Sequence, residues 1–572
     1  MSPLILPDLL RARAAEDPDG VALRVGEGTT LTLGAWERRS NAAARGLVGR
    51  GVRPGDRVAL LFDGSGWADY AVAYLAVHKA GAVAVPLGSR FAGRELDRIL
   101  DHAEPVGIVG RAHGARWAAG LEELEEGHVD ESFQITVDPK DLAEILYTSG
   151  TTGRPKGVAC SHLGIMAHDV PPDGAAATVA FLHGFPIGTQ AGQETLRVPL
   201  RIAGRTAIAV PHFDPDVVSA LVARHHVARL QLVPAMAQVL VGSPAVARHD
   251  LTSVRRVILS SAHAPPALFA RLAETFPSAT LWNAYALTEG GSARTLGQWD
   301  EARPSSVGRP VGETEVRIAG PDGLAAGPGQ VGEVWLRRRG TPTRTYYRDP
   351  AATAEVFVDG WVRTGDLGHL DGEGLLHLDD RIKDLIISGG TNISSVEVED
   401  VLGEHPDVVA AAVFGLAHPV LGEEVAAAVV VSGTVTPRQL RDFVRGRLAE
   451  HKVPRRLVLV DDLPRNASGK VVKGELRQRY DHEPETAPYV APSGAVEPVV
   501  AAIWAEVLGL PRVGADDDFF GLGGHSLAAA QIATRLADAL GRPVPVADVF
   551  EAPTVAELAQ RLARAATPDE AR

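Results

Sequence analysis

Strand-like and helix-like stretches alternate from the N-terminus onward, and this alternation constrains the fold of the 572-residue chain more than any other feature. Ala35–Leu47 and Ala68–Lys79 are helix-like, whereas Arg57–Phe62 and Gly81–Leu87 are continuous apolar runs of strand length. Continuous apolar strands that alternate with helices are typical of a largely parallel sheet covered on both faces. The sequence therefore predicts an α/β fold, and the pattern continues less regularly to about residue 378.

A second region of alternating elements covers residues 380–480. Its apolar runs Val408–Phe414 and Val425–Val431 are strand-like, and Pro437–Leu448 is helix-like. Residues 482–498 then carry four prolines without helical periodicity, which is typical of a fairly stiff, extended linker. We therefore expect a separate, smaller α+β unit that ends at this linker.

Beyond the linker the chain becomes helical. Pro498–Leu508, Ser526–Leu540 and Val555–Ala563 all have helical patterns. A segment of about 75 residues with three such helices predicts a small helical bundle tethered to the α/β body.

The composition argues against several other classes of protein. Hydrophobic residues make up 45% and charged residues 22% of the chain, which is typical of a globular rather than a disordered protein. Apolar runs are shorter than the ~20 residues that span a bilayer, and the N-terminus lacks a basic segment, so we expect a cytoplasmic protein without a membrane anchor. The formal net charge of −14 argues against a nucleic-acid partner. The single cysteine, Cys160, excludes an internal disulfide framework and a multi-cysteine metal site.

The strongest local signal is a strand that runs into a loop of glycines and hydroxyl residues at Ile145–Gly157. Glycines let backbone N–H groups approach an anion, hydroxyls add donors, and Lys156 adds positive charge. The spacing differs from that of a Walker loop, so the segment predicts a nucleoside triphosphate site of another kind. The expected phosphate contacts are Thr148, Ser149, Gly150, Thr151, Thr152, Gly153 and Lys156.

This loop resembles the phosphate loop of the adenylate-forming superfamily, which includes acyl-CoA synthetases, luciferases and the adenylation domains of nonribosomal peptide synthetases. Further motifs of that superfamily follow in order, and the resemblance covers roughly residues 20–480. They are Asn283–Glu289, similar to N-x-Y-G-x-T-E; Gly332–Leu336, similar to G-E-[LV]-x-[LIV]; Trp361–Asp366, similar to Y-x-T-G-D; Asp380–Ile386, similar to G-R-x-[DK]-D; and Asn466–Lys470, similar to N-x-x-G-K.

The resemblance implies a role for each matching residue in the nucleotide site. Tyr285 would stack on adenine, Thr288 would hydrogen-bond the α-phosphate, and Glu289 would hold Mg²⁺, a cation that prefers carboxylate oxygen. Asp366 would accept both ribose hydroxyls, with Arg381 close to the same sugar.

Two lysines complete this implied machinery. Lys470 would lie between the substrate carboxylate and the α-phosphate, where one ammonium neutralises two anions that must approach each other. Lys383 stands where the superfamily keeps the hinge about which its smaller domain rotates.

A second motif, Asp516–Leu527, resembles the attachment motif of peptidyl carrier domains. The resemblance implies that Ser526 carries 4′-phosphopantetheine at the start of a helix, whose N-terminus favours a phosphate. The alternative G-x-S-x-G hydrolase motif lacks its last glycine here, and no strand precedes the serine.

The two resemblances together imply an α/β protein with a large adenylate-forming N-terminal domain, a small mobile α+β C-terminal subdomain and a four-helix-type carrier bundle. The expected boundaries are 1–379 for the large subdomain, 380–481 for the small subdomain, 482–495 for the proline-rich linker and 496–572 for the carrier domain.

The acid pocket departs from that of amino-acid-activating domains. Gly184 stands where those domains keep an Asp that holds the substrate ammonium, and an ammonium buried without a carboxylate is costly. We therefore expect an acid without an α-amino group. His183 follows His162 by only 21 positions, fewer than expected, so a helix is predicted to be missing or reduced there. The expected lining residues are His183, Gly184, Phe185, Gly188, Thr189, His263, Ala284 and Ser292.

These features predict a nonribosomal-peptide-synthetase-type loading didomain that makes an acyl-AMP from ATP and passes the acyl group to its own carrier. Alternatives are an amino-acid-activating didomain and an acyl-CoA ligase that releases free acyl-CoA. A scaffold with an inactive body is disfavoured because Lys470, Glu289 and Asp366 are all present. The expected partners are a small carboxylic acid, a phosphopantetheinyl transferase, and a separate condensation or acyltransferase protein that removes the product.

Overall fold

The computed structural model of the chain describes residues 5–88, 91, 93–114, 117–148, 155–167, 179–418, 421–466, 470–481, 489–517, 519, 522, 524, 526–552 and 554–564. By the contacts among its residues, the chain forms two compact units. The first consists of 1–385 with 399–409 and 464–472, and the second of 386–398, 410–463 and 473–572.

One sheet of the first unit has the order β18-β8-β7-β4-β3-β5-β6. The strands β7, β4, β3, β5 and β6 are parallel, as the apolar runs predict, and β8 and β18 add an antiparallel edge. Their bounds are β3 Arg57–Phe62, β4 Val83–Gly88, β5 Gly107–Gly110, β6 Ala118–Ala119, β7 Leu142–Thr148, β8 Lys156–Ser161 and β18 Thr345–Tyr346.

The second sheet runs in the order β16-β17-β20-β21-β15-β14-β13-β12-β11-β9-β10-β1-β2, with β19 beside β20. Its segment from β13 to β1 is parallel, and the strands from β13 through β14 to β16 pair antiparallel. The bounds are β1 Val21–Val25, β2 Thr29–Thr32, β9 Val179–His183, β10 Arg205–Ala209, β11 Arg229–Leu232, β12 Arg256–Ser260, β13 Thr280–Ala286, β14 Arg294–Gln298, β15 Ser306–Pro310, β16 Thr314–Ala319, β17 Gly332–Arg338, β19 Phe357–Val358, β20 Trp361–Leu370 and β21 Leu376–Arg381.

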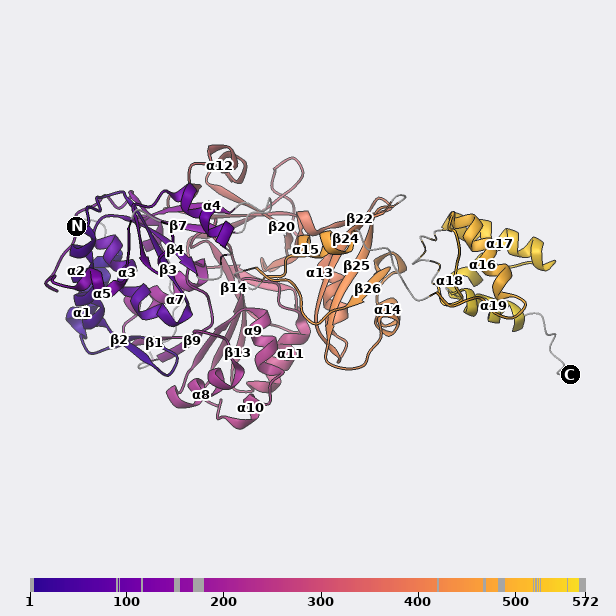
Figure 1. The fold of residues 1–572 in the computed structure, drawn as a ribbon, viewed down its shortest axis with the longest axis horizontal. Helices are drawn as coiled ribbons and strands as arrows, with labels where there is room; N and C mark the ends of the chain where they lie inside the picture. Colours follow the sequence, from indigo (N-terminus) through magenta and orange to yellow (C-terminus); the bar gives the residue numbers. More distant parts are fainter. Residues whose placement is uncertain are drawn as a thin grey trace. The chain divides into compact units, whose positions relative to one another are not determined.

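Helix α3 (Trp67–Lys79) packs against strands of both sheets and is buried along almost its whole length. A helix that is apolar on all sides belongs in a core. Helix α2 (Leu33–Gly49) packs against α3, and Figure 1 shows α1, α2 and α5 gathered with it at the N-terminal end of the chain. The helices expected over Ala35–Leu47 and Ala68–Lys79 are thereby confirmed.

The remaining helices of the first unit lie before, between and after these strands in the chain. Their bounds are α1 Leu6–Glu16, η1 Gly64–Gly66, α4 Gly93–Ala103, α5 Leu121–Glu125, α6 His162–Met166, α7 Gln190–Arg201, α8 Pro215–His225, α9 Pro234–Val241, α10 Ala245–Arg248, α11 Pro266–Thr275, α12 Pro350–Val356 and η2 Ile382–Asp384.

The second unit contains a small sheet in the order β23-β22-β25-β24, with β26 beside β25. The two strands expected from the apolar runs are confirmed, but the helix expected over Pro437–Leu448 ends at Arg445 because Gly446 is its C-cap. The bounds are β22 Ile386–Ser388, β23 Thr391–Ile393, β24 Val408–His418, β25 Gly422–Val431, β26 Arg456–Leu459, α13 Ser395–Gly403, α14 Pro437–Arg445, η3 Glu450–Lys452 and α15 Lys473–Tyr480.

The C-terminal part of the chain folds into the predicted helical bundle (Figure 1, yellow). The helical pattern predicted three of its helices, and the short α18 is a fourth, in agreement with the four-helix-type bundle that the resemblance implies. Trp504 and Phe519 are fully buried at its centre, with ring centroids 5.3 Å apart. The bounds are α16 Glu497–Leu508, α17 Ser526–Leu540, α18 Val546–Glu551 and α19 Val555–Arg564.

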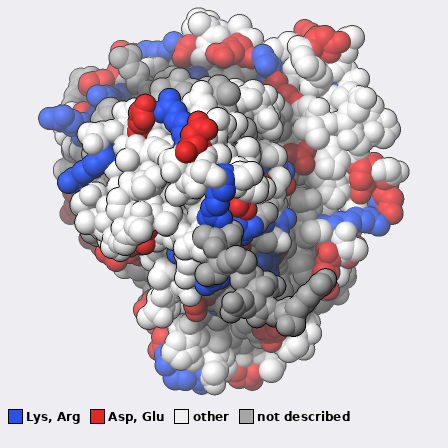
Figure 2. Space-filling view, turned by 90° about the vertical axis from the view of Figure 1, so that its right-hand side faces the viewer, with Lys and Arg blue, Asp and Glu red and all other residues white. Residues whose placement is uncertain are grey.

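Within the described residues, no helix is long and apolar enough to cross a membrane. On the face drawn in Figure 2, lysine and arginine side chains lie among aspartate and glutamate side chains, with large uncharged areas between them.

A buried ion pair lies between the first sheet and α7. Arg197 Nη2 is 2.6 Å from Glu144 Oε2, and both side chains have no exposed surface. The Tyr74 hydroxyl donates to the same carboxylate oxygen over 2.9 Å. Because both charges are out of water, each depends on the other to remain buried at an acceptable cost.

We expect Arg197→Met to lower the free energy of unfolding by about 3–5 kcal/mol, because it leaves Glu144 buried without a counter-charge. The matched exposed variant Arg224→Met, which breaks the pair with Glu27, should cost less than about 1 kcal/mol. Chemical denaturation followed by tryptophan fluorescence measures both, and Glu144→Gln added to Arg197→Met should restore part of the loss. Equal, small losses from the two arginine variants would contradict this account.

Candidate active site

The carboxylate of Asp366 joins three strands of the second sheet. Its Oδ2 accepts a 2.6 Å hydrogen bond from the Tyr285 hydroxyl on β13, and its Oδ1 accepts one of 2.7 Å from Arg381 Nε on β21. Asp366 and Arg381 are direct partners in the β20–β21 ladder, which fixes this contact. Burial and the Asp366 charge raise the pKa of Tyr285, so its hydroxyl stays protonated and donates. The structure thus brings together three residues that the sequence placed in the nucleotide site.

Lys470 joins the same group of charges. Its N–H donates to Asn466 Oδ1 over 3.0 Å, and the Asn466 N–H donates to the Lys470 carbonyl over 2.9 Å. Residues 464–472 belong to the first unit by their contacts. Burial, followed by the positive charge of Arg381, lowers the pKa of Lys470 to about 8, while Asp366 and Glu289 act in the opposite direction. Its ammonium therefore lies within electrostatic reach of the predicted nucleotide residues.

Tyr346 connects Glu289 to the end of the predicted phosphate loop, and no sequence motif indicated this role. Its hydroxyl donates to Glu289 Oε1 over 3.0 Å, and Lys156 Nζ lies 4.8 Å from its ring centroid. Thr148 and Lys156 face each other in the β7–β8 ladder, which holds the two ends of the loop together. The predicted contacts Ser149, Gly150, Thr151, Thr152 and Gly153 lie outside the described residues.

Arg344 is a second contact that the motifs did not indicate. Its Nη1 donates to the carbonyl of Thr288 over 2.6 Å and to Gln190 Oε1 over 2.9 Å. The side chain therefore connects the residue before Glu289 to the first residue of α7. Neither Arg344 nor Tyr346 belongs to a recognised motif; only their place in a Tyr-Tyr-Arg-rich stretch distinguishes them in the sequence.

The segment from His183 to Gln190 forms one side of the predicted pocket. His183 is buried, with ring centroids 5.3 Å from Trp67 and 6.0 Å from Phe185, and burial lowers its pKa to about 3, so the imidazole is neutral. Thr189 caps α7 by accepting a hydrogen bond from Gly192 N–H. The sequence missed Trp67, which no motif includes.

Gly184 lies in a tightly filled position. A Cβ at this residue would come within 2.8 Å of Met236 Sδ and 3.3 Å of Phe213 Cδ2. Gly188 has a φ of +83°, a conformation that favours glycine. Pocket position 184 is therefore bordered by apolar side chains.

The other predicted pocket residues lie on different segments. Ala284 is on β13, paired with Ser260, and Ser292 is buried in the turn after Glu289. His263 Nε2 is 2.7 Å from Asp400 Oδ1, so this histidine has a carboxylate partner of its own. Helix α6 has only five residues, and residues 168–178 lie outside the described part of the chain.

The predicted hinge residue Lys383 lies in η2. The chain passes from the first compact unit to the second between Leu385 and Ile386, directly after η2.

Ser526 begins α17, and its side chain is outside the described atoms. Just before it, a Cβ at Gly524 would clash with the Phe519 backbone oxygen, so this position requires glycine.

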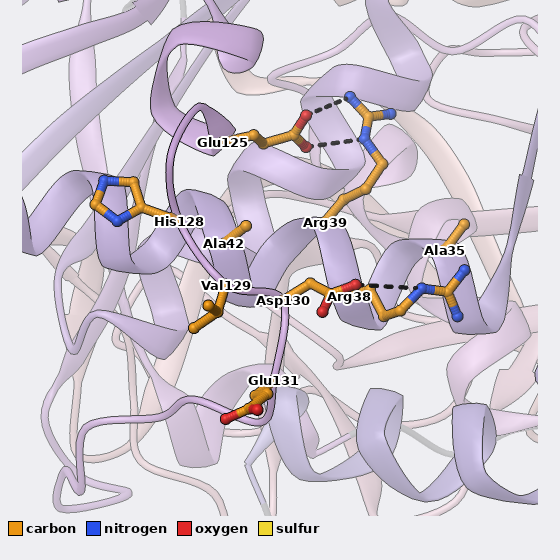
Figure 3. A pocket seen from close by; sticks show the side chains of 9 residues that line it. All are labelled: Ala35, Arg38, Arg39, Ala42, Glu125, His128, Val129, Asp130 and Glu131. Atoms are coloured by element: carbon orange, nitrogen blue, oxygen red, sulfur yellow. Dashed lines mark hydrogen bonds and ion pairs between the residues drawn. The ribbon is translucent and has the colours of Figure 1, made fainter.

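The cavity drawn in Figure 3 lies elsewhere in the first unit. It has a volume of about 570 Å³ between α2 and residues 125–131. Two of its side-chain pairs neutralise each other: Arg39 with Glu125 at 2.8 Å, and Arg38 with Asp130 at 3.6 Å. None of the predicted site residues lines it.

Comparison with protein families accounts for this arrangement. Residues 10–347 match the AMP-binding enzyme family, 397–470 match the AMP-binding enzyme C-terminal domain, and 498–562 match the phosphopantetheine attachment site. The chain is an AMP-binding enzyme. It is an ATP-dependent, AMP-forming carboxylic acid ligase that uses Mg²⁺, and its carrier region bears 4′-phosphopantetheine, which a phosphopantetheinyl transferase attaches.

Characterised relatives include several CoA ligases. This AMP-binding enzyme is 36% identical to a feruloyl-CoA synthase of Amycolatopsis over 495 residues, which cover 82% of this chain and 97% of the relative. It is 32% identical to the long-chain-fatty-acid–CoA ligase FadD13 of Mycobacterium tuberculosis, with 82% and 98% covered.

Solved structures agree with the fold. ATP-bound MatB from Rhodopseudomonas palustris is 30% identical with a TM-score of 0.75, covering 84% of this chain and 99% of MatB. The amide bond synthetase McbA from Marinactinospora thermotolerans is also 30% identical, with a TM-score of 0.74 and 83% and 100% covered. The expected superfamily, fold class and ligase activity are thereby confirmed.

The lowered pKa of Lys470 generates a pH prediction. In its predicted role beside the α-phosphate, Lys470 acts in its charged form and loses its proton as pH rises through about 8, so kcat/KM for acid activation should fall about tenfold per pH unit above that value. Arg381→Met removes a positive neighbour and should move this alkaline limb to higher pH. Pyrophosphate exchange across neutral and alkaline pH measures the profile, and a limb that stays in place in the variant would contradict the assignment to Lys470.

Proposed function

We propose that this AMP-binding enzyme is a nonribosomal-peptide-synthetase-type loading didomain. It activates a carboxylic acid that lacks an α-amino group and transfers it, as a thioester, to the phosphopantetheine arm on its own Ser526. The observation that carries the proposal is the phosphopantetheine attachment region at 498–562 on the same chain as the AMP-binding region at 10–347. A carrier in the same chain has a high effective concentration at the site that activates the acid.

In the proposed reaction, a carboxylate oxygen of the acid attacks the α-phosphorus of ATP and pyrophosphate leaves. Lys470 lies between the two anions and offsets their repulsion, and Thr288 hydrogen-bonds the α-phosphate. The partly buried position of Lys470 beside Arg381 and Asp366 supports this role, because electrostatic interactions are stronger where water is excluded.

Other residues position the nucleotide. Asp366 accepts the ribose hydroxyls, with Arg381 adjacent, and Tyr285 stacks on the adenine while its hydroxyl remains on Asp366. The expected loop residues, from Thr148 to Lys156, surround the phosphates.

Glu289 holds Mg²⁺ in this proposal. It is a single carboxylate, and the described residues contain no group of three His, Cys, Asp or Glu that would form a complete metal site. Mg²⁺ commonly enters with substrate phosphates and one or two carboxylates, which fits a lone Glu289 oriented by Tyr346. The ion would supply charge to the phosphate oxygens.

The nature of the acid is inferred from the surroundings of Gly184. Met236 and Phe213 border this position, and His183 nearby is neutral, so these groups do not favour an ammonium. The remaining pocket contacts proposed are Phe185, Gly188, Thr189, His263, Ala284 and Ser292. The names of the relatives, feruloyl-CoA synthase and long-chain-fatty-acid–CoA ligase, describe acids without an α-amino group and support an aryl or aliphatic acid here.

The domain assignment follows from the same proposal. The large subdomain is 1–379, the small one 380–481, the linker 482–495 and the carrier 496–572, with Lys383 as the hinge between the first two. A condensation or acyltransferase partner on another chain would remove the acyl group.

A second candidate is an acyl-CoA ligase that releases free acyl-CoA, because the characterised relatives include CoA ligases. In that case the thiol of CoA, rather than the carrier arm, would displace AMP. An amino-acid-activating didomain is the third possibility, and the apolar border of Gly184 argues against it.

Intact-protein mass spectrometry tests the proposal. The protein is first converted to its holo form with a phosphopantetheinyl transferase and then mixed with ATP, Mg²⁺ and pooled acids. We expect one acyl adduct on the carrier of the native chain and none on Ser526→Ala, which keeps its pyrophosphate exchange. Acyl-CoA in solution without an adduct would instead favour the second candidate, and an amino-acid adduct the third.

Lys470→Ala should lower the rate of acid-dependent pyrophosphate exchange by about 10²–10³, as expected when one group that stabilises transition-state charge is removed. Lys473→Ala is the matched control, because Lys473 lies close to Lys470 in the chain and donates to Ser395 at the start of α13 over 2.7 Å. The role of Lys470 would be disproved by an equal, small effect of both substitutions.

A further inference from the structure

The guanidinium of Arg344 is buried next to the proposed acid pocket. Arg344 is 7% exposed, and its Nη1 donates to the Thr288 carbonyl over 2.6 Å and to Gln190 Oε1 over 2.9 Å. It also lies against Gly291, where a Cβ would come within 2.9 Å of Arg344 Nε. The side chain thus reaches the turn after Glu289 and the first residue of α7 at the same time.

Among the described residues, the hydrogen-bond acceptors of the Arg344 guanidinium are all uncharged. Its two oxygen acceptors are amide-type, and in the described part of the chain no carboxylate forms an ion pair with Arg344. Two other arginines of this unit do form ion pairs with carboxylates: Arg197 pairs with Glu144, and Arg381 pairs with Asp366. Because buried arginines are almost always paired, a missing negative charge at Arg344 indicates an anionic ligand.

The neighbours of Arg344 place this charge on the acid side of the site. Gln190, its partner, directly follows the pocket residue Thr189, and its Nε2 also donates to the Gly291 carbonyl over 3.4 Å. Glu194 accepts from Gln190 over 3.1 Å and also lies 2.8 Å from Arg201, so it has a cation of its own. The phosphate side has another cation, Lys156, over the Tyr346 ring.

We propose that Arg344 is a specificity-determining residue that binds a second anionic group of the acid, so that the preferred substrate is a dicarboxylic acid. The inference rests on the proposed acid activation. One carboxylate reacts beside Lys470, while the other accepts hydrogen bonds from the guanidinium, whose fork matches a carboxylate. The triphosphate of ATP carries the same anionic chemistry, and the experiment separates these two sources.

Pyrophosphate exchange with matched acids tests the proposal on the full holo chain. The probes are pairs of equal carbon number, butanoic with butanedioic acid and hexanoic with hexanedioic acid, together with benzoic and benzene-1,4-dicarboxylic acid. We expect a higher kcat/KM for the diacid in at least one pair, and Arg344→Gln should lower that value about 10- to 100-fold with little change for the monoacid. Arg344→Lys, which keeps the charge, should restore part of the preference.

Arg348→Gln is the matched control, because Arg348 is exposed, pairs with Glu104 and lies four residues further along the same segment. It should leave the ratio of diacid to monoacid unchanged. Thermal unfolding of all variants separates a specificity effect from a folding defect. If Arg344→Gln is destabilised, the ratio of diacid to monoacid is measured on Arg344→Lys, which should lower it in part; a ratio equal to that of the native chain would then contradict the proposal.

Several results would overturn the proposal. One is exchange that favours the monoacids or is absent with every diacid. Another is an Arg344→Gln variant in which KM for ATP rises while the ratio of diacid to monoacid kcat/KM stays the same. That result would show that Arg344 binds the triphosphate of ATP and not the acid. Carrier loading is measured separately by mass, so diacid-dependent exchange without an adduct on Ser526 would disprove the loading function and leave the role of Arg344 intact.

Discussion

The proposed nucleotide site depends on the contacts of the Asp366 carboxylate. Asp366 lies on β20, in the antiparallel part of the second sheet, and accepts hydrogen bonds from the Tyr285 hydroxyl on β13 and the Arg381 guanidinium on β21. Charge-assisted bonds of this kind are strong and geometrically specific. They hold Tyr285 and Arg381 at fixed positions before a ligand arrives, and this preorganisation lowers the cost of binding.

Buried charges in this protein follow two arrangements. Arg197 and Glu144 neutralise each other inside the core, where no ligand is needed. Lys470 and Arg344 instead lie beside the predicted substrate positions. The pKa of Lys470 is lowered, and the guanidinium of Arg344 donates to uncharged oxygen acceptors. A site that processes ATP and a carboxylate brings negative charge with its substrates, so cations without a complete set of protein partners are expected there.

Periodicity predicted much of the fold, and motif order singled out residues that the structure brings together, among them Tyr285, Asp366 and Arg381. The strands Arg57–Phe62 and Val425–Val431 and the helix Ser526–Leu540 are present where the apolar pattern placed them. The pattern did not indicate α18, a helix of six residues, because a short helix gives little periodic signal. Tyr285, Asp366, Arg381 and Lys470 were found because each lies within a short string of characteristic residue types.

The sequence by itself determined the fold class, the carrier bundle and the identity of the motif residues, because these depend on local patterns along the chain. The tertiary structure alone decided that Tyr346 orients Glu289 and that Arg344 lies between Thr288 and Gln190. These partners are 57, 56 and 154 residues apart in the chain. Such contacts arise from the pairing of β18 with β8 and from the packing of sheets on helices, and no local spacing encodes them.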